Sequence, residues 1–212
     1  MVDAKVRGAF ILFEGIDRCG KSTQARCLLD ALRSQGLQVE IINFPNRTTP
    51  IGKIINEYLI GNTDINGQAL HLMFSANRWE MKEYIESRLA SGTSLIVDRY
   101  VYSGIAFSVA KGLDIEWCKS SDIGLPNPDI TILLDMSIDE TQRRSGYGQE
   151  RYENEAMQTQ VRRIFQMLQR PEWKIVNAAR PMDVVHREIR SFVMSDLERI
   201  MKNPISHIAA EI

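Results

Sequence analysis

The segment from Gly15 to Ser22 constrains the fold of this chain of 212 residues more than any other feature. It reads Gly-Ile-Asp-Arg-Cys-Gly-Lys-Ser and fits the pattern G-x-x-x-x-G-K-[ST] without a mismatch. An apolar run at residues 9–14, typical of a buried strand, precedes it, and a helical pattern at residues 21–34 follows it. A strand, a glycine-rich turn and a helix in this order present backbone N–H groups at a helix N-terminus, which favours binding of phosphate.

Further short apolar runs predict four more strands, at residues 39–43, 94–98, 130–135 and 174–177. Helical patterns fall at residues 51–60, 68–91, 102–111, 139–144, 153–168 and 182–201. This alternation predicts an α/β fold, a doubly wound five-stranded parallel sheet flanked by helices, P-loop NTP hydrolase-like, with a short lid. Ligands of such a sheet bind beyond the carboxyl ends of its strands, which is where the motifs below fall.

Length and composition favour one globular domain over residues 1–212. The net charge of −1 gives no indication of a nucleic-acid or membrane surface. No apolar stretch is long enough for a signal peptide or a membrane span. The three cysteines, Cys19, Cys27 and Cys118, lack metal-ligand spacing, which favours free thiols in a reducing compartment. We therefore expect a cytoplasmic protein, with a nuclear location also open.

Two positions suggest a magnesium–nucleotide site. In a phosphate loop, Lys21 places a cation on the β- and γ-phosphates, and the hydroxyl of Ser22 is a ligand for Mg²⁺. Asp98 ends a predicted buried strand, where it either organises Mg²⁺ or caps the following turn. Arg99 follows directly and favours the first interpretation, because it sets a phosphate-binding cation beside the metal-organising anion.

Absent motifs narrow the class of phosphate-loop protein. The sequence has no Asn-Lys-x-Asp segment for reading guanine, and a motor or transporter ATPase is usually longer. A small kinase needs cations for the acceptor phosphate and a ring for the acceptor base. Phe44 and Arg47 follow the second strand, and Phe74 and Arg78 share a helix face at a spacing of four. Core packing remains the alternative for Phe74.

Several segments together resemble the thymidylate kinase family, whose members phosphorylate dTMP. The resemblance runs in order from about residue 8 to residue 200 and is closest to the eukaryotic form. Beyond the phosphate loop at residues 15–23, it is carried by Phe-Pro-Asn-Arg at 44–47, Leu-Met-Phe-Ser-Ala-Asn-Arg-Trp-Glu at 72–80, Asp-Arg-Tyr at 98–100, Ser-Gly at 103–104, Gly-Leu-Pro at 124–126 and Glu-Arg-Tyr-Glu at 150–153.

The resemblance implies a transfer of the γ-phosphate of ATP to dTMP, giving ADP and dTDP for dTTP biosynthesis. Asp17 matches a residue that contacts the 3′-hydroxyl of the dTMP sugar, and Arg18 matches one that reaches the transferring phosphate. Arg47 and Arg99 match positions that hold the acceptor phosphate or bridge donor and acceptor. The loop residues matched to ATP and its Mg²⁺ are Arg18, Cys19, Gly20, Lys21, Ser22 and Thr23.

In the implied acceptor site, Phe74 matches the ring that stacks on thymine and Arg78 the group that bonds its edge. Tyr152 matches a tyrosine that disfavours a ribose 2′-hydroxyl. The other implied lining residues are Phe44, Ser103 and Phe107.

A lid is expected at residues 143–152, with Gly146 and Gly148 giving it mobility; a plain surface loop is the alternative. Arg143 and Arg144 stand at its start. Besides Arg18 and Arg99, the resemblance assigns Arg143, Arg180 and Arg190 to the ATP site. For the last two, an ordinary solvated position is the competing interpretation.

The implied chemistry needs no general base, because the attacking phosphate oxygen is already ionised near neutral pH. Alignment and charge neutralisation fall to Arg18, Lys21, Asp98 and Arg99 with Mg²⁺. Two residues depart from the family pattern. Asn46 stands where an acid is expected, and Cys19 replaces a smaller residue, either as an oxidisable thiol or merely filling its position.

Two alternatives remain open. The same fold could act on another acceptor, such as dUMP or a deoxynucleoside, although the pair Arg47 and Arg99 favours a monophosphate. A nucleotide-binding module without chemistry is the other, and Lys21, Asp98 and the lid together argue against it. The resemblance also implies a homodimer, through helices near residues 70–90 and 100–110.

Overall fold

A five-stranded sheet forms the centre of the computed structural model, which describes residues 6–144 and 148–210. Its strands are β1 (Phe10–Glu14), β2 (Val39–Asn43), β3 (Ser94–Asp98), β4 (Ile130–Asp135) and β5 (Lys174–Asn177). All neighbours pair in parallel, in the order β2-β3-β1-β4-β5. Phe10 pairs with Leu95 on one side, and Ile11 pairs with Ile130 on the other. The predicted fold is therefore confirmed, with β1 at the centre of the sheet.

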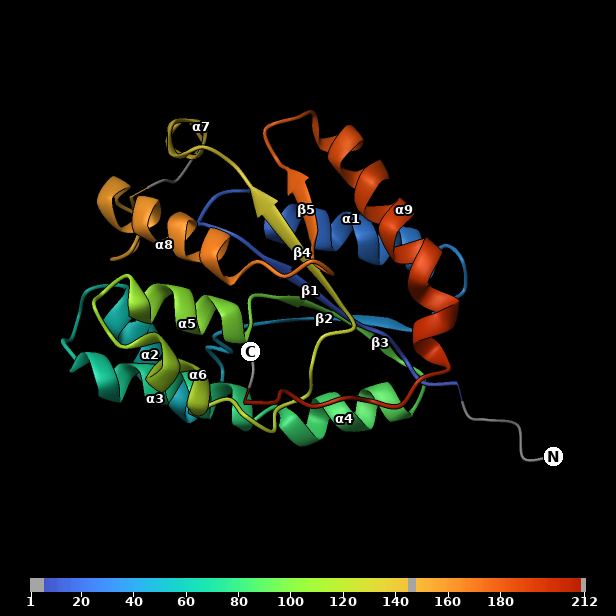
Figure 1. Cartoon of the computed structure of the whole chain (residues 1–212), viewed down its shortest axis with the longest axis horizontal. Coiled ribbons are helices and arrows are strands. Elements are labelled where there is room, and N and C mark those ends of the chain that lie inside the picture. The colour runs from blue at the N-terminus through green and yellow to red at the C-terminus, as the bar shows by residue number, and fades with distance from the viewer. Residues whose placement is uncertain (1–5, 145–147, 211–212) are drawn as a thin grey trace.

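Helices cover both faces of this sheet. They are α1 (Lys21–Arg33), α2 (Pro50–Leu59), α3 (Gly67–Trp79), α4 (Lys82–Ala90), α5 (Val101–Val109), α6 (Ile115–Ser120), α7 (Ile138–Gln142), α8 (Glu155–Leu168) and α9 (Met182–Met201). α1 and α9 pack together on one face, and α4, α5 and α8 lie on the other (Figure 1). Right-handed crossovers place α1 on the face opposite to α4, α5 and α8, because the connection from β1 to β2 crosses the sheet in one direction and the later connections cross it in the other.

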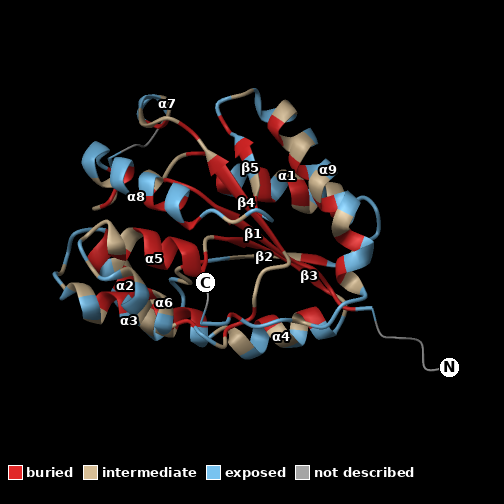
Figure 2. Cartoon of the chain, in the orientation of Figure 1, coloured by how far each residue is buried: buried red, intermediate tan, exposed pale blue. Residues whose placement is uncertain are grey.

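The core lies between the sheet and these helices. All five residues of β1 and of β3 are buried, and Figure 2 shows the central strands in the buried colour. On α1 the side chains of Leu28 and Leu32, one turn apart, are completely buried. The sheet therefore holds the ends of β1 and β3 in fixed positions, and the loops that follow them start from a rigid edge.

The predicted helix over residues 68–91 is wrong in one respect, because the structure divides it into α3 and α4. The backbone N–H of Met81 donates to the carbonyl of Arg78 at 3.0 Å, a tighter turn than that of an α-helix. Neither glycine nor proline marks the break in the sequence. The short helix α6 was not predicted; Asp114 caps its N-terminus, where its carboxylate accepts the N–H of Trp117 at 2.8 Å.

Candidate active site

The loop between β1 and α1 has the backbone geometry of an anion cradle. Gly15 and Gly20 have φ values of 141° and 102°, which favour glycine. A Cβ on Gly15 would lie 2.5 Å from the carbonyl oxygen of Leu134, so no other residue fits there. Helix α1 begins at Lys21, and its first N–H groups open onto the loop. The Nζ of Lys21 donates to the carbonyl of Ile16 at 2.7 Å and so lies across the cradle.

Ser22 and Asp98 form a candidate metal position where α1 begins, beside the sheet. The hydroxyl of Ser22 donates to Asp98 Oδ2 at 2.5 Å, although the two residues come from α1 and β3. Hydroxyl and carboxylate oxygens suit a hard cation such as Mg²⁺. The described residues contain no group of three or more His, Cys, Asp or Glu side chains that could hold a metal. The fit is therefore to a magnesium ion that takes its other ligands from phosphate and water. Thr23 follows on the exposed side of α1.

Arg18 and Arg99 are the non-glycine residues with positive φ in the described chain, at 59° and 68°. Both guanidiniums are held by carboxylates. Arg18 Nε donates to Glu153 Oε1 at 2.8 Å, and this bond raises the pKa of Arg18. Arg99 pairs with Asp17, and its Nη1 also donates to the carbonyl of Gly15 at 2.9 Å. Burial alone would lower the pKa of Arg99, but the neighbouring carboxylates, Asp17 first, raise it above the ordinary value.

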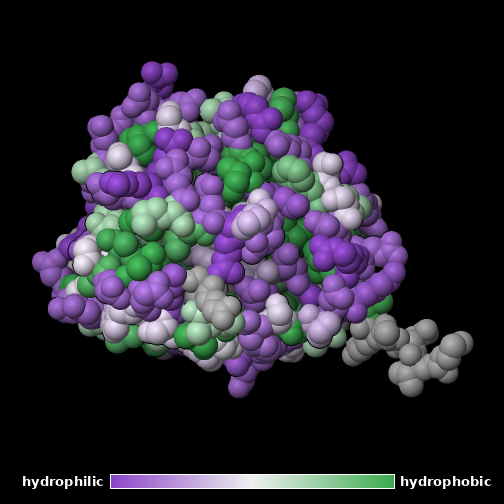
Figure 3. All heavy atoms as spheres, in the orientation of Figure 1, coloured by the Kyte–Doolittle hydropathy of each residue, from purple (hydrophilic) through white to green (hydrophobic). Residues whose placement is uncertain are grey.

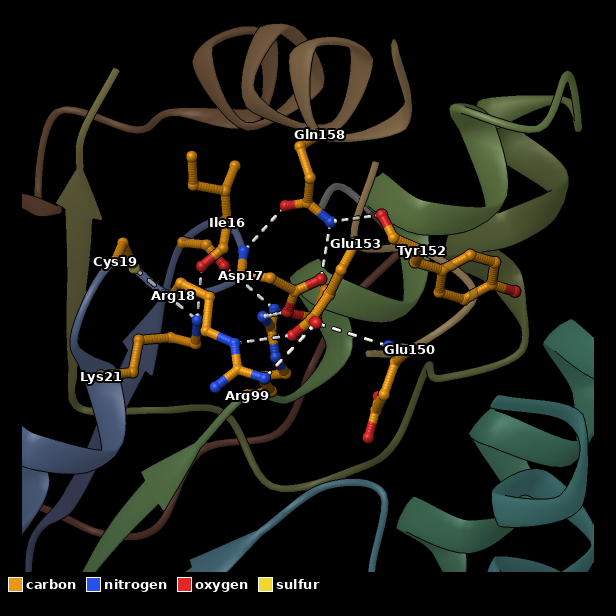
Figure 4. Close-up of polar contacts among 12 residues, drawn as sticks. Ile16, Asp17, Arg18, Cys19, Lys21, Arg99, Glu150, Tyr152, Glu153 and Gln158 are labelled. Carbon is orange, nitrogen blue, oxygen red and sulfur yellow. Dashed lines mark hydrogen bonds and ion pairs between the residues drawn. The ribbon is translucent and has the colours of Figure 1, made fainter. Parts of the chain in front are cut away.

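Asp17 is also fixed from the side of α8. Gln158 Nε2 donates to Asp17 Oδ2 at 2.6 Å, and the backbone N–H of Asp17 donates to Gln158 Oε1 at 2.8 Å. Figure 4 shows Gln158 above the loop, with Asp17 and Arg99 directly beneath it and Glu153 beside Arg18. Sequence reasoning assigned no role to Gln158. Its signal is weak, because a glutamine within a helix is ordinary.

Glu14 is a further residue that sequence reasoning missed. Its carboxylate is completely buried at the end of β1 and accepts the backbone N–H groups of Tyr100 at 2.9 Å and Ser103 at 3.0 Å, together with the Ser103 hydroxyl. Burial raises the pKa of Glu14, while the bonds from Ser103 and the charge of Arg99 oppose that shift. Glu14 therefore ties the turn after β3 to the end of β1. The available signal was an acid ending an otherwise apolar buried strand.

A pocket opens beside Asp17 and Arg99, and it brings together every residue predicted to bind the acceptor. Those residues are Asp17, Phe44, Arg47, Phe74, Arg78, Arg99, Ser103, Phe107 and Tyr152. Lys111 also lines the pocket and was not predicted. Its Nζ donates to the hydroxyl of Tyr152 at 2.9 Å, and burial lowers the pKa of Lys111 to about 8. The pocket therefore combines rings with cations at the carboxyl edge of the sheet.

Arg78 is the most deeply placed of these cations, with 2 % of its side chain exposed. Its Nη2 and Nε donate to the two carboxylate oxygens of Asp122, at 2.6 Å and 3.1 Å. The hydroxyl of Ser75 donates to the same carboxylate at 2.7 Å. Gly104 leaves the space for this guanidinium, because a Cβ there would lie 2.7 Å from Arg78 Nη2. The predicted pocket arginine is thus anchored by an acid that sequence reasoning did not identify.

The predicted lid falls partly outside the described residues, since residues 145–147, including Gly146, are not among them. Glu150 from its second half pairs with Arg47 at 2.7 Å. At its start, Arg144 and not Arg143 approaches the phosphate loop: a Cβ on Gly20 would lie 3.0 Å from Arg144 Nη1. Arg143 is exposed.

The remaining predicted residues come from the phosphate loop itself, from the turn after β5 and from α9. Arg180 pairs with Glu188 and donates to the carbonyl of Asn177 at 3.1 Å, just after β5. Arg190 is exposed on α9. Cys19 is buried, which favours the interpretation that it merely fills its position. None of these three lines the acceptor pocket.

Comparisons with known proteins agree with this arrangement. The family model described as thymidylate kinase matches residues 13–189. Curated thymidylate kinases are similar over most of their length: that of Dictyostelium discoideum is 45 % identical over 95 % of this chain and 92 % of its own, and that of Homo sapiens is 40 % identical over 95 % and 97 %. The solved structure of thymidylate kinase from Candida albicans superposes with a TM-score of 0.86 at 37 % identity, covering 96 % of this chain and 99 % of its own. The chain therefore belongs to the thymidylate kinase family.

Proposed function

We propose that this protein transfers the γ-phosphoryl group of ATP to dTMP, giving ADP and dTDP in the supply of dTTP. One observation carries the proposal beyond family membership. Asp17 belongs to the phosphate loop, and both Asp17 and its ion-pair partner Arg99 line the acceptor pocket, so one ion pair adjoins both substrates. An enzyme that joins two phosphates needs such a shared edge, because their oxygens must come into line.

In the proposed mechanism the side chains orient the two substrates and neutralise the charge of their phosphates. Lys21 and Arg18 face the donor phosphates, while Arg99 and Arg47 hold the acceptor phosphate beside them. The attacking oxygen is ionised near neutral pH, so no side chain has to remove a proton. Mg²⁺, held with ATP by Ser22 and Asp98, would neutralise phosphate charge when bound. The rate of phosphoryl transfer then depends on how well these side chains align the two phosphates and neutralise their charge.

The acceptor base would enter between Phe74 and the wall that contains Arg78. A ring supplies a stacking surface, and a buried guanidinium supplies donors for the base edge. Tyr152 closes the side towards the lid, where its ring lies 5.4 Å from that of Phe107. This arrangement favours a deoxynucleoside monophosphate with acceptors on its base.

A coupled assay with ATP and dTMP, dUMP, UMP, CMP, AMP or thymidine tests the proposal. We expect dTMP to be the preferred acceptor and thymidine to give no turnover, because thymidine lacks the phosphate that Arg47 and Arg99 hold. Preference for another monophosphate would support the alternative kinase. Binding of ATP without turnover of any monophosphate would support the non-catalytic module. The Candida albicans structure is described as revealing an origin of broad substrate specificity, so turnover of dUMP should be measured at the same precision as turnover of dTMP.

We further propose a single-domain homodimer in the cytoplasm, with the nucleus also open, and no nucleic-acid partner. All strands of the described residues belong to one sheet, and the net charge is −1. In the described part of the chain no helix is both long and apolar enough to cross a membrane. Figure 3 shows apolar side chains gathered on the surface over α5, and Leu72 on α3 is 49 % exposed. Sedimentation as a monomer at micromolar concentration would contradict the dimer.

A further inference from the structure

The C-terminal segment, residues 204–208, lies beside the loop that precedes β4. Gly124 N–H donates to the carbonyl of Ile208 at 2.9 Å, and Ile208 N–H donates to that of Leu125 at 2.8 Å. Asn127 N–H donates to the carbonyl of Ser206 at 2.9 Å, and Pro126 forms an antiparallel bridge with His207. Figure 1 shows the red C-terminal segment running along this loop below the sheet. The tail thus pairs with residues 124–127 through backbone hydrogen bonds and a single antiparallel bridge.

This pairing is anchored at both ends. The side chain of Ile208 is 3 % exposed and belongs to the main core, as does that of Leu125. Arg7 donates to the carbonyls of Asn203 at 2.6 Å and Pro204 at 3.3 Å, where the tail leaves α9. His207 pairs with Glu86 of α4 at 2.8 Å. A segment held by core packing and backbone hydrogen bonds has a fixed position, unlike a frayed terminus.

The loop that the tail holds also carries Asp122, the partner of Arg78. Asp122 is completely buried, and its position is set by the same short turn, since Leu125 N–H donates to its carbonyl at 3.2 Å. Arg78 in turn lines the acceptor pocket. A path of direct contacts therefore leads from Ile208 through Leu125 and Asp122 to the pocket.

We propose that residues 204–208 position the acceptor-reading guanidinium, so that the tail determines how well the enzyme selects its acceptor base. This rests on the proposed function. The tail touches no substrate: it fixes the loop 122–127, which fixes Asp122, which holds Arg78 against the base edge. A displaced Arg78 would lose its donor contacts to thymine and would discriminate less against a cytosine, which presents an amino group at the corresponding position.

The test compares Ile208→Ala with Ser206→Ala. Ser206 is exposed and takes part through its carbonyl, so its replacement keeps the backbone pairing and serves as the control. We expect Ile208→Ala to raise KM for dTMP about tenfold and to lower the preference for dTMP over dCMP, with KM for ATP unchanged. Ile208→Val should keep KM for dTMP and the preference for dTMP close to those of wild type. Ser206→Ala should change neither quantity.

Three outcomes overturn the proposal. The first is an equal loss with both acceptors, or a loss of stability with selectivity intact, because either reduces the tail to a general stabiliser. The second is an equal fall in the preference for dTMP over dCMP in Ser206→Ala. If Ile208→Ala does not fold, the third is an Ile208→Val variant that has lower stability but unchanged selectivity. In every case the wild-type protein's turnover of dTMP separates failure of this inference from failure of the proposed function.

Discussion

Replacing Gly104 by alanine sets two effects of opposite sign against each other. Gly104 lies within α5, where alanine favours the helix by about 1 kcal/mol. A Cβ at this position, however, would lie 2.7 Å and 2.8 Å from the two terminal nitrogens of Arg78, where ordinary contacts begin near 3.4 Å. The guanidinium would have to move by roughly 0.7 Å in a close-packed interior. It has little freedom to do so, because both oxygens of Asp122 hold it.

Acceptor binding should therefore suffer more than stability. A misplacement of about 1 Å in a substrate-positioning group can cost up to about a hundredfold, so we expect KM for dTMP to rise roughly tenfold or more. KM for ATP should not change, and the helix propensity should offset part of any loss in Tm. The measurements are initial rates with each substrate varied, together with thermal unfolding.

Gly67→Ala is the matched control. Gly67 begins α3, and a Cβ there would lie 3.8 Å from its nearest neighbour, Leu113 Cδ2, an ordinary contact. Both substitutions add one methyl group to a glycine of a helix, but only the methyl group at position 104 would press on Arg78. An unchanged KM for dTMP in Gly104→Ala would refute the reasoning that Arg78 must keep its present position.

Three further substitutions test the donor side and the pocket wall. Arg18→Ala should lower the single-turnover rate of phosphoryl transfer by about a hundredfold with little change in ATP affinity; an unchanged rate would remove Arg18 from the transferring phosphate. Asp98→Asn should raise the Mg²⁺ concentration for half-maximal activity at least about tenfold, and normal metal dependence would end its assigned role. The pKa of Lys111 is about 8, below the ordinary 10.5, so the folded state loses this proton at a lower pH than the unfolded state does. The free energy of unfolding should therefore rise as pH increases from 8 towards 10.5. Denaturation at about pH 7.5 and pH 9.5 should show that the free energy of unfolding of wild type rises with pH relative to that of Lys111→Met. Parallel pH profiles of the two proteins would contradict this.

The parts of the molecule that local patterns determine were predictable from the sequence. The β3 and β4 boundaries agree, because these apolar runs end at an acid, Asp98 or Asp135. The phosphate loop follows from one motif. The capping box at Ser137 and Glu140 made even the five-residue α7 foreseeable, since its signal lies within four positions.

The contacts that give the pocket its detail are long-range and had no such signal. Asp122, in the turn after α6, bonds Arg78 of α3, and nothing in the spacing of the two residues connects them. The break between α3 and α4 lacks a glycine or proline, so the helical period continues through it in the sequence. The tail reads as an ordinary terminus until Ile208 is seen beside Leu125. Burial and pairing in three dimensions decide these features, and a linear pattern does not contain them.

The central place of β1 also bears on how the chain acquires its shape during synthesis. β1 leaves the ribosome first, yet its partners come much later, since Phe10 pairs with Leu95 and Ile11 with Ile130. Contacts so distant along the chain slow folding and leave the apolar run of β1 without neighbours in the meantime. A nascent chain that stops short of β4 thus contains the full phosphate-loop motif but lacks the sheet that would hold it in shape.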